Sequence, residues 1–232
     1  MSAYAPNTHE RASVAVDLAV LTVMDADLKV FLVRRNTHPF KNLWALPGGF
    51  VQAGRGAHLG EDLAAAARRT LRTTTGLPNG AGRLAQLQTF GRSERDPRGR
   101  TISVSWTALV PPDRAALIQV TDAREGWFSC AEEVPWMRLA FDHADILHAA
   151  IDRTRADIEY TNLAFSLVPS TFTVGELRDV HEAVKGSKHD ARNFRRRFQR
   201  LVDDDKVEEA PGRRHLGRAR PAKVWRFKAG LQ

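Results

Sequence analysis

The sequence predicts an α/β protein in two parts: an N-terminal α/β/α sandwich with a mixed sheet, and a C-terminal winged helix-turn-helix. Strand-like apolar runs alternate with helical segments through residues 1–155, whereas residues 156–232 hold two capped helices and a hairpin. The charge divides in the same way. Residues 185–232 carry 15 Lys+Arg against 6 Asp+Glu, a net +9, which leaves 20 against 21, a net −1, for the rest. We therefore expect two domains, a near-neutral body and a basic end that suits nucleic acid.

Composition narrows the class of protein further. The chain has 232 residues and one cysteine, Cys130, which excludes an internal disulfide and a cysteine-based zinc cluster. The first apolar run, Val14 to Met24, contains Asp17 and is too short to span a bilayer. No basic segment followed by a small-residue cleavage site precedes it. We expect a cytoplasmic protein with no membrane association.

The N-terminal elements follow from periodicity and turn residues. Two apolar bursts, Val14–Val23 and Lys29–Val33, flank the turn Asp25–Asp27 and predict a hairpin. Gly48 and Gly49 predict a tight turn with its backbone close to a ligand. The remaining elements are expected to be a helix from about Glu61 to Thr75 that stops at Gly76, strands at 84–90, 101–109 and 125–128, and a helix that Leu139-Ala-Phe-Asp-His143 opens and that continues to about Arg155.

The helix over residues 61–75 resembles the Nudix box, the glutamate-rich helix that binds divalent metals in enzymes cleaving nucleoside diphosphates. In that pattern an arginine precedes three glutamates, but here Arg69 precedes Thr70, Thr73 and Thr74. These positions share one helical face, and neutral hydroxyls are weak magnesium ligands beside carboxylates. Of the acidic positions in the box pattern, only Glu61 still carries a carboxylate. The frame predicts a cleft that binds a nucleotide without metal and without hydrolysis, although the threonines would equally suit a solvated helix face.

The loop Arg95-Asp-Pro-Arg-Gly-Arg100 carries more arginines than a hairpin turn needs. Guanidinium groups match phosphate oxygens, so the loop suits a metal-free diphosphate site, with a solvated loop as the alternative. Phe141 is a candidate for stacking on a base, and His143 for a structural or capping role. The expected ligand-binding residues are Arg35, Trp44, Gly48, Gly49, Phe50, Arg69, Arg95, Arg100 and Phe141.

The C-terminal segment encodes two helices joined by a turn of three to four residues. Thr173 and Glu176 match a capping box, Gly186 supplies a left-handed stop, and Asp190 caps the second helix. The inward residues are expected to be Val174, Leu177, Val180, His181 and Val184, then Ala191, Phe194, Phe198, Leu201 and Val202. The outward face is Arg192, Asn193, Arg195, Arg196, Gln199 and Arg200. These side chains read base edges or hold phosphates, which predicts a helix-turn-helix.

Two further strands, Lys206–Glu209 and Lys223–Lys228, flank a Gly/Arg-rich tip at Pro211–Pro221 and predict a wing. Arginines at such a tip follow a phosphate backbone or enter a minor groove. Val224, Trp225 and Phe227 are expected in the core and not on bases. The expected DNA-binding residues are Thr173, Lys188, Arg192, Asn193, Arg195, Arg196, Gln199, Arg213, Arg214, Arg218 and Arg220.

Across nearly its whole length the chain resembles the NrtR family of Nudix-related transcriptional regulators. The motifs that carry the resemblance are Leu46-Pro-Gly-Gly-Phe-Val51 with the altered box, Thr89-Phe-Gly, Arg95-Asp-Pro-Arg-Gly-Arg100, Leu139-Ala-Phe-Asp-His143, Phe172-Thr-Val-Gly-Glu-Leu-Arg178, Arg192-Asn-Phe-Arg-Arg196 and Arg220-Pro-Ala222. The resemblance implies a homodimeric repressor that binds palindromic operator DNA upstream of NAD biosynthesis genes. ADP-ribose, or a related NAD metabolite, is the implied effector, and no cofactor is implied.

Two departures leave alternatives open. Gln52 to Gly60 looks longer than the usual connection to the box helix, and the wing reads Gly217-Arg-Ala-Arg-Pro-Ala222 where the family has a tighter turn. The effector and the operator are therefore open, since relatives also regulate sugar-utilisation genes. An active ADP-ribose hydrolase is a second hypothesis, with metal held by Glu61 and Asp62. An RNA-binding Nudix protein is a third.

Overall fold

The computed structural model describes residues 11–54, 60–120, 124–159, 162–214 and 221–228. Its main sheet contains β1 (Ser13–Met24), β2 (Asp27–Arg34), β3 (Trp44–Ala45), β4 (Gly48–Phe50), β5 (Arg83–Phe90), β6 (Thr101–Leu109) and β7 (Glu125–Ser129). The strand order is β3-β2-β1-β6-β5, with β4 paired to β1 and β7 paired to β2. β1 and β6 are parallel and the other pairs are antiparallel, so the sheet is mixed, as predicted.

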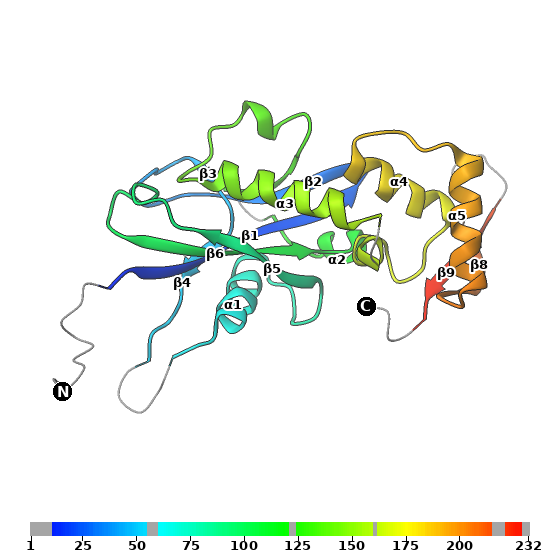
Figure 1. The fold of residues 1–232 in the computed structure, drawn as a ribbon, viewed down its shortest axis with the longest axis horizontal. Helices are drawn as coiled ribbons and strands as arrows, with labels where there is room; N and C mark the ends of the chain where they lie inside the picture. Colours follow the sequence, from blue (N-terminus) through cyan, green and yellow to red (C-terminus); the bar gives the residue numbers. More distant parts are fainter. Residues whose placement is uncertain (1–10, 55–59, 121–123, 160–161, 215–220, 229–232) are drawn as a thin grey trace, which may run out of the picture.

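Helices cover both faces of this sheet (Figure 1). α1 (Leu63–Thr75) packs Ala66, Ala67 and Leu71 onto one face, where Leu18 of β1 also lies. α3 (His143–Asp157) covers the opposite face. Alternate residues of a strand point to opposite faces, so burial on both sides explains why apolar residues follow one another along most of β1. Short helices α2 (Pro112–Ala115) and η2 (Val134–Trp136) lie in the connections. The predicted α/β/α sandwich is confirmed.

The C-terminal module contains η3 (Asn162–Ser166), α4 (Val174–Lys185), α5 (Ala191–Asp203), β8 (Val207–Arg214) and β9 (Ala222–Phe227). At the start of α4, Thr173 Oγ1 accepts from Glu176 N, and Glu176 Oε2 accepts from Thr173 N. Gly186 ends α4 at φ 67°, and the Asp190 side chain caps α5. The helix pair and its caps are thus confirmed. The turn between the helices is longer than predicted, five residues at 186–190.

Several local details differ from the sequence prediction. Gly48 and Gly49 lie in strand β4 and not in a tight turn, and the reason for glycine at 48 is a close approach. A Cβ there would lie 2.2 Å from Asp17 Oδ1. Ala191 is exposed and does not join the core, because the first residue of α5 lies beyond the packed stripe. Among the described residues, no helix is long and apolar enough to cross a membrane.

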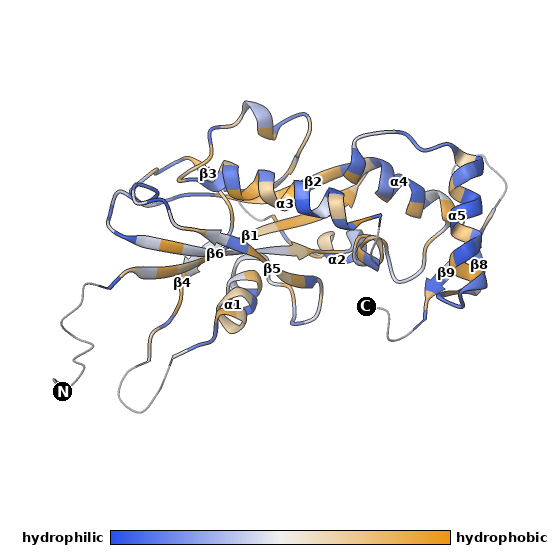
Figure 2. Ribbon diagram, viewed as in Figure 1, coloured by the Kyte–Doolittle hydropathy of each residue, from blue (hydrophilic) through white to orange (hydrophobic). Residues whose placement is uncertain are grey.

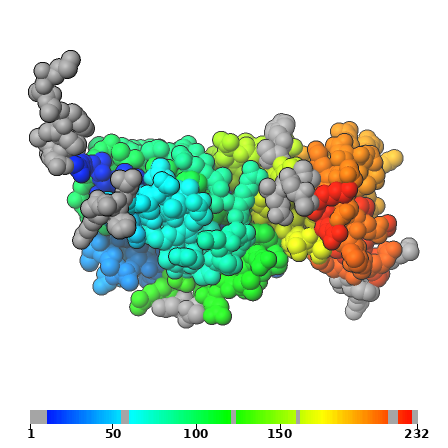
Figure 3. Space-filling view, turned by 90° about the horizontal axis from the view of Figure 1, so that it is seen from below, coloured from blue at the N-terminus to red at the C-terminus, as the bar shows by residue number. Residues whose placement is uncertain are grey.

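One hydrophobic core joins the sheet to the C-terminal module. It runs from Val30 of β2 through Ile146 of α3 to Leu177 of α4 and Phe198 of α5. Phe172 is fully buried and stacks on Phe227 of the wing, with ring centroids 4.5 Å apart. Hydrophobic residues fill the central strands, whereas α5 is mostly hydrophilic (Figure 2). The module forms one end of the molecule (Figure 3).

Candidate functional site

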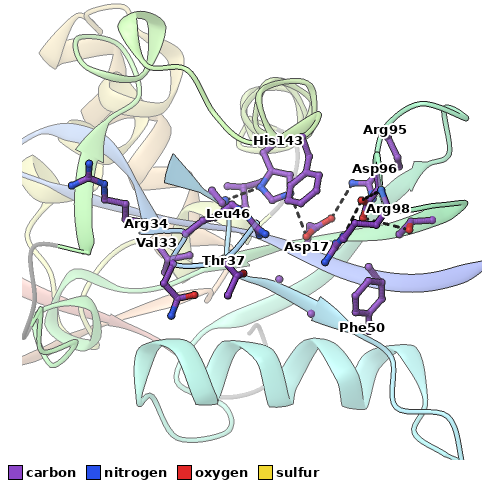
Figure 4. Close-up of a pocket in the computed structure, with 18 of the residues that line it drawn as sticks. Asp17, Val33, Arg34, Thr37, Leu46, Phe50, Arg95, Asp96, Arg98 and His143 are labelled. Atoms are coloured by element: carbon purple, nitrogen blue, oxygen red, sulfur yellow. Dashed lines mark hydrogen bonds and ion pairs between the residues drawn. The ribbon is translucent and has the colours of Figure 1, made fainter. Parts of the chain in front are cut away.

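A cavity of about 620 Å³ opens between the sheet, the loop that follows β5 and the start of α3. β1 and β4 supply its floor, and the end of β2 supplies one wall (Figure 4). Six residues expected at the ligand line it, namely Arg35, Gly48, Gly49, Phe50, Arg95 and Phe141. Residues that sequence reasoning missed also line it, among them Asp17, Arg34, Asn36, Thr37, Asp96, Arg98, Arg124 and Glu125.

A buried charge network forms the floor of the cavity. Arg95 Nη2 donates to Asp142 Oδ1 at 2.7 Å and to Asp17 Oδ2 at 3.2 Å, and Arg95 Nε donates to Asp142 Oδ2 at 2.9 Å. Ser103 Oγ donates to Asp17 Oδ2 at 2.6 Å. Burial lowers the pKa of Arg95, but the two carboxylates outweigh it and leave this pKa raised. Arg95 lines the cavity, but both of its described ion pairs are with carboxylates of the protein itself.

His143 ties this network to the backbone beside it. Its Nδ1 accepts a hydrogen bond from Leu46 N at 2.9 Å, while its Nε2 lies 3.5 Å from Asp17 Oδ1. Burial lowers the pKa of His143, so the neutral imidazole with its proton on Nε2 fits both contacts. The side chain therefore holds the start of α3 against the sheet.

Two other guanidinium groups face the open part of the cavity. Arg98 lies over the rings of Phe50 and Phe141, at 5.3 and 5.6 Å from their centroids, and its fork binds Asp96. Arg35 lies 4.6 Å from the centroid of Phe141. Burial and the nearby Arg98 lower the pKa of Arg35. Arg98 is one of the three arginines of the predicted diphosphate loop, although only Arg95 and Arg100 were named among the expected ligand-binding residues.

Three residues expected at the ligand lie outside the cavity lining. Trp44 packs edge-on against Phe128, with centroids 4.7 Å apart. Arg69 forms an ion pair with Glu61, in which Arg69 Nε donates to Glu61 Oε2 at 2.9 Å. Arg100 Nη1 donates to the carbonyl oxygen of Gly91 at 2.7 Å. Each side chain has a structural partner, which corrects its expected place at the ligand.

The box threonines do not form a uniform solvated face. Thr70 is buried, 2% exposed, and its Oγ1 has no hydrogen-bond partner among the described residues. Thr73 is exposed, and its hydroxyl donates to Thr70 O at 3.2 Å. The hydrogen bond from Arg69 lowers the pKa of Glu61, whose carboxylate forms an ion pair with that guanidinium group. Within the described ranges, no group of three or more His, Cys, Asp or Glu side chains is placed to hold a metal.

The second candidate surface is the outward face of α5. Its exposed residues are Arg192, Asn193, Arg195, Arg196, Gln199 and Arg200. In the part of the chain that the structure describes, none of these four arginines forms an ion pair. Arg197 points the other way and donates to Glu159 O at 2.8 Å. Cations without partners on one exposed helix match the phosphate backbone of nucleic acid.

Two residues near this face differ in their exposure. Lys188 is exposed and pairs with Glu182 at 2.9 Å. Thr173 is 1% exposed and serves as the helix cap, so its expected DNA contact through the side chain is corrected.

The first two arginines of the wing lie in other positions than predicted. β8 extends to Arg214, so Arg213 and Arg214 lie in a strand and not in the tip. Arg214 Nη1 donates to both carboxylate oxygens of Glu176 at 2.7 Å, which makes it an anchor of the wing on α4. Arg213 is exposed. Arg218 and Arg220 lie outside the described residues. Val224 is buried and Trp225 packs on Phe198, as expected of core residues.

Comparison with known proteins matches both parts of this architecture. A NUDIX domain model matches residues 14–150, and a model described as the NrtR DNA-binding winged helix domain matches residues 164–227. The chain is 32% identical over 227 residues to the ADPR responsive transcriptional repressor NtrR of Acinetobacter baylyi, which covers 98% of this chain and 86% of that protein. It is 34% identical over 130 residues to the ADP-ribose pyrophosphatase of Methanocaldococcus jannaschii, covering 56% of this chain and 70% of that enzyme.

Solved structures of S. oneidensis NrtR resemble both parts of the chain. Shewanella oneidensis NrtR complexed with a 27mer DNA has a TM-score of 0.79 and 31% identity, covering 93% of each chain. The Nudix domain of S. oneidensis NrtR complexed with ADP ribose has a TM-score of 0.50 and 30% identity, covering 65% of this chain and 93% of that one. With both domain models in the same order and a relative matched over nearly the full length, this chain belongs to the NrtR family of Nudix-related transcriptional regulators.

Proposed function

We propose that this protein is a DNA-binding transcriptional repressor that senses ADP-ribose, or a related NAD metabolite, and does not hydrolyse it. The observation that carries the proposal is the presence, in one body, of a cavity with facing arginines and aromatic rings and of an unneutralised basic helix. Three comparisons support it: one relative is named as an ADPR responsive repressor, and S. oneidensis NrtR has been solved with DNA and, as its Nudix domain, with ADP ribose. We further propose that it acts as a homodimer on palindromic operators of NAD biosynthesis genes.

The cavity suits a diphosphate without a metal. Arg35 and Arg98 both present guanidinium groups to the ring of Phe141, and Arg35 has no carboxylate partner among the described residues, so a diphosphate would balance its charge. Phe50 is 47% exposed, so part of its ring is accessible to a base. The positions that hold glutamates in the Nudix box pattern are Thr70, Thr73 and Thr74, which supply no anionic metal ligand.

Helix α3 is the element that connects the cavity to the DNA-binding module. Its first residue, His143, contacts the cavity floor. Near its other end Arg155 Nε donates to Val184 O, the last turn of α4, at 3.0 Å. Glu159 follows, with its carboxylate 3.1 Å from Lys185 Nζ. A ligand that favours one position of α3 would therefore change the position of the helix pair, which is what coupling between two sites requires.

A gel shift with the protein's own upstream DNA, titrated with ADP-ribose, tests both sites together. We expect Arg196→Ala to abolish DNA binding and to leave ADP-ribose binding, measured by calorimetry, unchanged. Arg98→Ala should do the opposite, weakening ADP-ribose by about tenfold or more while DNA binding persists. Arg68→Ala, an exposed arginine of α1 outside both sites, is the matched control. Loss of both activities in either variant would contradict the assignment of separate sites.

A second candidate function, ADP-ribose hydrolysis, is favoured by the identity to the pyrophosphatase of M. jannaschii. It would need a metal bound outside the threonine face, for example by Glu61 and Asp62, and Glu61 is already paired with Arg69. Release of AMP from ADP-ribose with magnesium would establish this function. We expect no release above the rate without protein.

A further inference from the structure

A second hollow, of about 420 Å³, adjoins the cavity and is lined by cations. Arg34, Arg35, Asn36 and Arg124 line both spaces, while Lys41 and Asn42 line the second one alone. We call this hollow, defined by those six residues, the cationic annex. Arg34 and Thr37 in Figure 4 mark the side of the cavity that leads to it. Because the two spaces share walls, one ligand can reach into both.

The annex is built by the connection between β2 and β3. Asn42 N donates to Arg35 O at 2.8 Å, and Arg35 N donates to Leu43 O at 2.9 Å, which close the loop on itself. Phe40 and Asn42 hold left-handed φ angles of 60° and 70°, conformations that side chains other than glycine adopt at a cost. The side chains are held too, since Arg34 Nε donates to Asn42 O at 2.9 Å. Backbone carbonyls thus fix where the guanidinium groups point.

Charge distinguishes the annex from an ordinary polar surface. Four of its six residues are cations, and no carboxylate lines it. Among the described residues, neither Arg34, Arg35 nor Lys41 forms an ion pair with an acid, unlike Arg69 and Arg95 nearby. Like charges that a loop holds together repel one another until an anion enters. The amide groups of Asn36 and Asn42 add neutral donors for its oxygens.

We propose that the cationic annex binds a phosphate monoester. The preferred ligand of this protein is then a nucleoside diphosphate sugar that carries one additional phosphate, its diphosphate beside Arg98 and its extra phosphate in the annex. The inference deepens the proposed function and rests on it. A nucleic-acid phosphate has the same chemistry, but the annex favours the small ligand because it continues into the cavity and shares four of its residues.

Calorimetry of the full chain with ADP-ribose and with ADP-ribose phosphorylated on either of its ribose rings tests the proposal. We expect at least one phosphorylated form to bind about tenfold more tightly than ADP-ribose, as a charge-assisted hydrogen bond would give. Lys41→Ala should remove that gain and change the affinity for ADP-ribose less than about twofold. Lys41 is exposed and lines the annex but not the cavity, so its replacement leaves the fold intact. Lys29→Ala, which changes the same charge outside both spaces, is the matched control.

The outcomes separate this inference from the function on which it rests. If ADP-ribose binds and neither phosphorylated form gains affinity, the annex proposal is wrong and the sensor proposal stands. Equal loss of both ligands in Lys41→Ala also overturns it. If Lys41→Ala weakens operator DNA in a gel shift without ligand, the annex is a DNA contact and the proposal fails. Absence of binding by all three ligands overturns the sensor proposal itself.

Discussion

Replacing Arg95 with alanine removes the cation that lies between two buried carboxylates. The side chains of Arg95, Asp17 and Asp142 are 3%, 8% and 9% exposed, so water does not take the place of the guanidinium group. Removing one partner of a buried ion pair costs about 3–5 kcal/mol, because the remaining charge is left without compensation. Against a typical free energy of unfolding of about 5–15 kcal/mol, this is a large loss.

Arg92 provides the matched control. Like Arg95 it lies in the loop between β5 and β6, and it pairs with Asp145 of α3. Its Nη1 lies 3.2 Å from Asp145 Oδ2, but the two side chains are 72% and 48% exposed. Arg92→Ala should cost about 0–1 kcal/mol. Urea denaturation followed by circular dichroism measures both values, with a lower midpoint and an unchanged slope expected for Arg95→Ala. A loss below about 1 kcal/mol, or equal losses in the two variants, would refute the view that Arg95 is a structural residue.

Three other outcomes are expected. Burial, and then Arg197, lower the pKa of His181 to about 4. As the pH falls, His181 is therefore protonated in the unfolded chain before it is protonated in the folded protein. The free energy of unfolding falls by roughly 3 kcal/mol as the pH drops from 6.5 to 4. His181→Leu should flatten the pH dependence of the melting temperature between pH 6.5 and 5; an unchanged slope would contradict this. Gly48→Ala should displace the Asp17 carboxylate, lower the melting temperature and weaken ADP-ribose binding about tenfold in calorimetry, whereas wild-type values would exclude the close approach. Cys130 is half-buried, and this burial raises the pKa of its thiol to about 12, so a disulfide reagent at pH 8 should label the native protein much more slowly than the denatured one; equal labelling rates would disprove the raised pKa.

Local signals predicted the elements well. The hairpin of β1 and β2, the capping box at Thr173 and the stop at Gly186 depend on residues a few positions apart, which a sequence displays directly. The interior of the cavity depends on distant pairs. Asp17 meets Ser103 and Arg95, 86 and 78 residues away, and no local pattern indicates those contacts.

Two of the wrong assignments, those of Arg214 and Arg69, share one cause. Arg214 has the residue type of a phosphate ligand, but Glu176 lies opposite it once the wing folds back on α4. Arg69 likewise meets Glu61. An arginine is free for a ligand only when the fold brings no carboxylate to it, and this depends on tertiary structure. The four exposed arginines of α5 could be separated from the others only in that way.

The single core that joins the sheet to the helix pair also determines how the molecule comes apart. Ile146, Leu177 and Phe198 belong to one buried cluster, so neither half keeps its apolar surface covered when the other is removed. We expect one cooperative unfolding transition for the whole chain, and a lower melting temperature for the N-terminal part when it is expressed alone. Substitutions in this shared core should therefore weaken ligand binding and DNA binding together, even though its residues Ile146, Leu177 and Phe198 do not line the cavity.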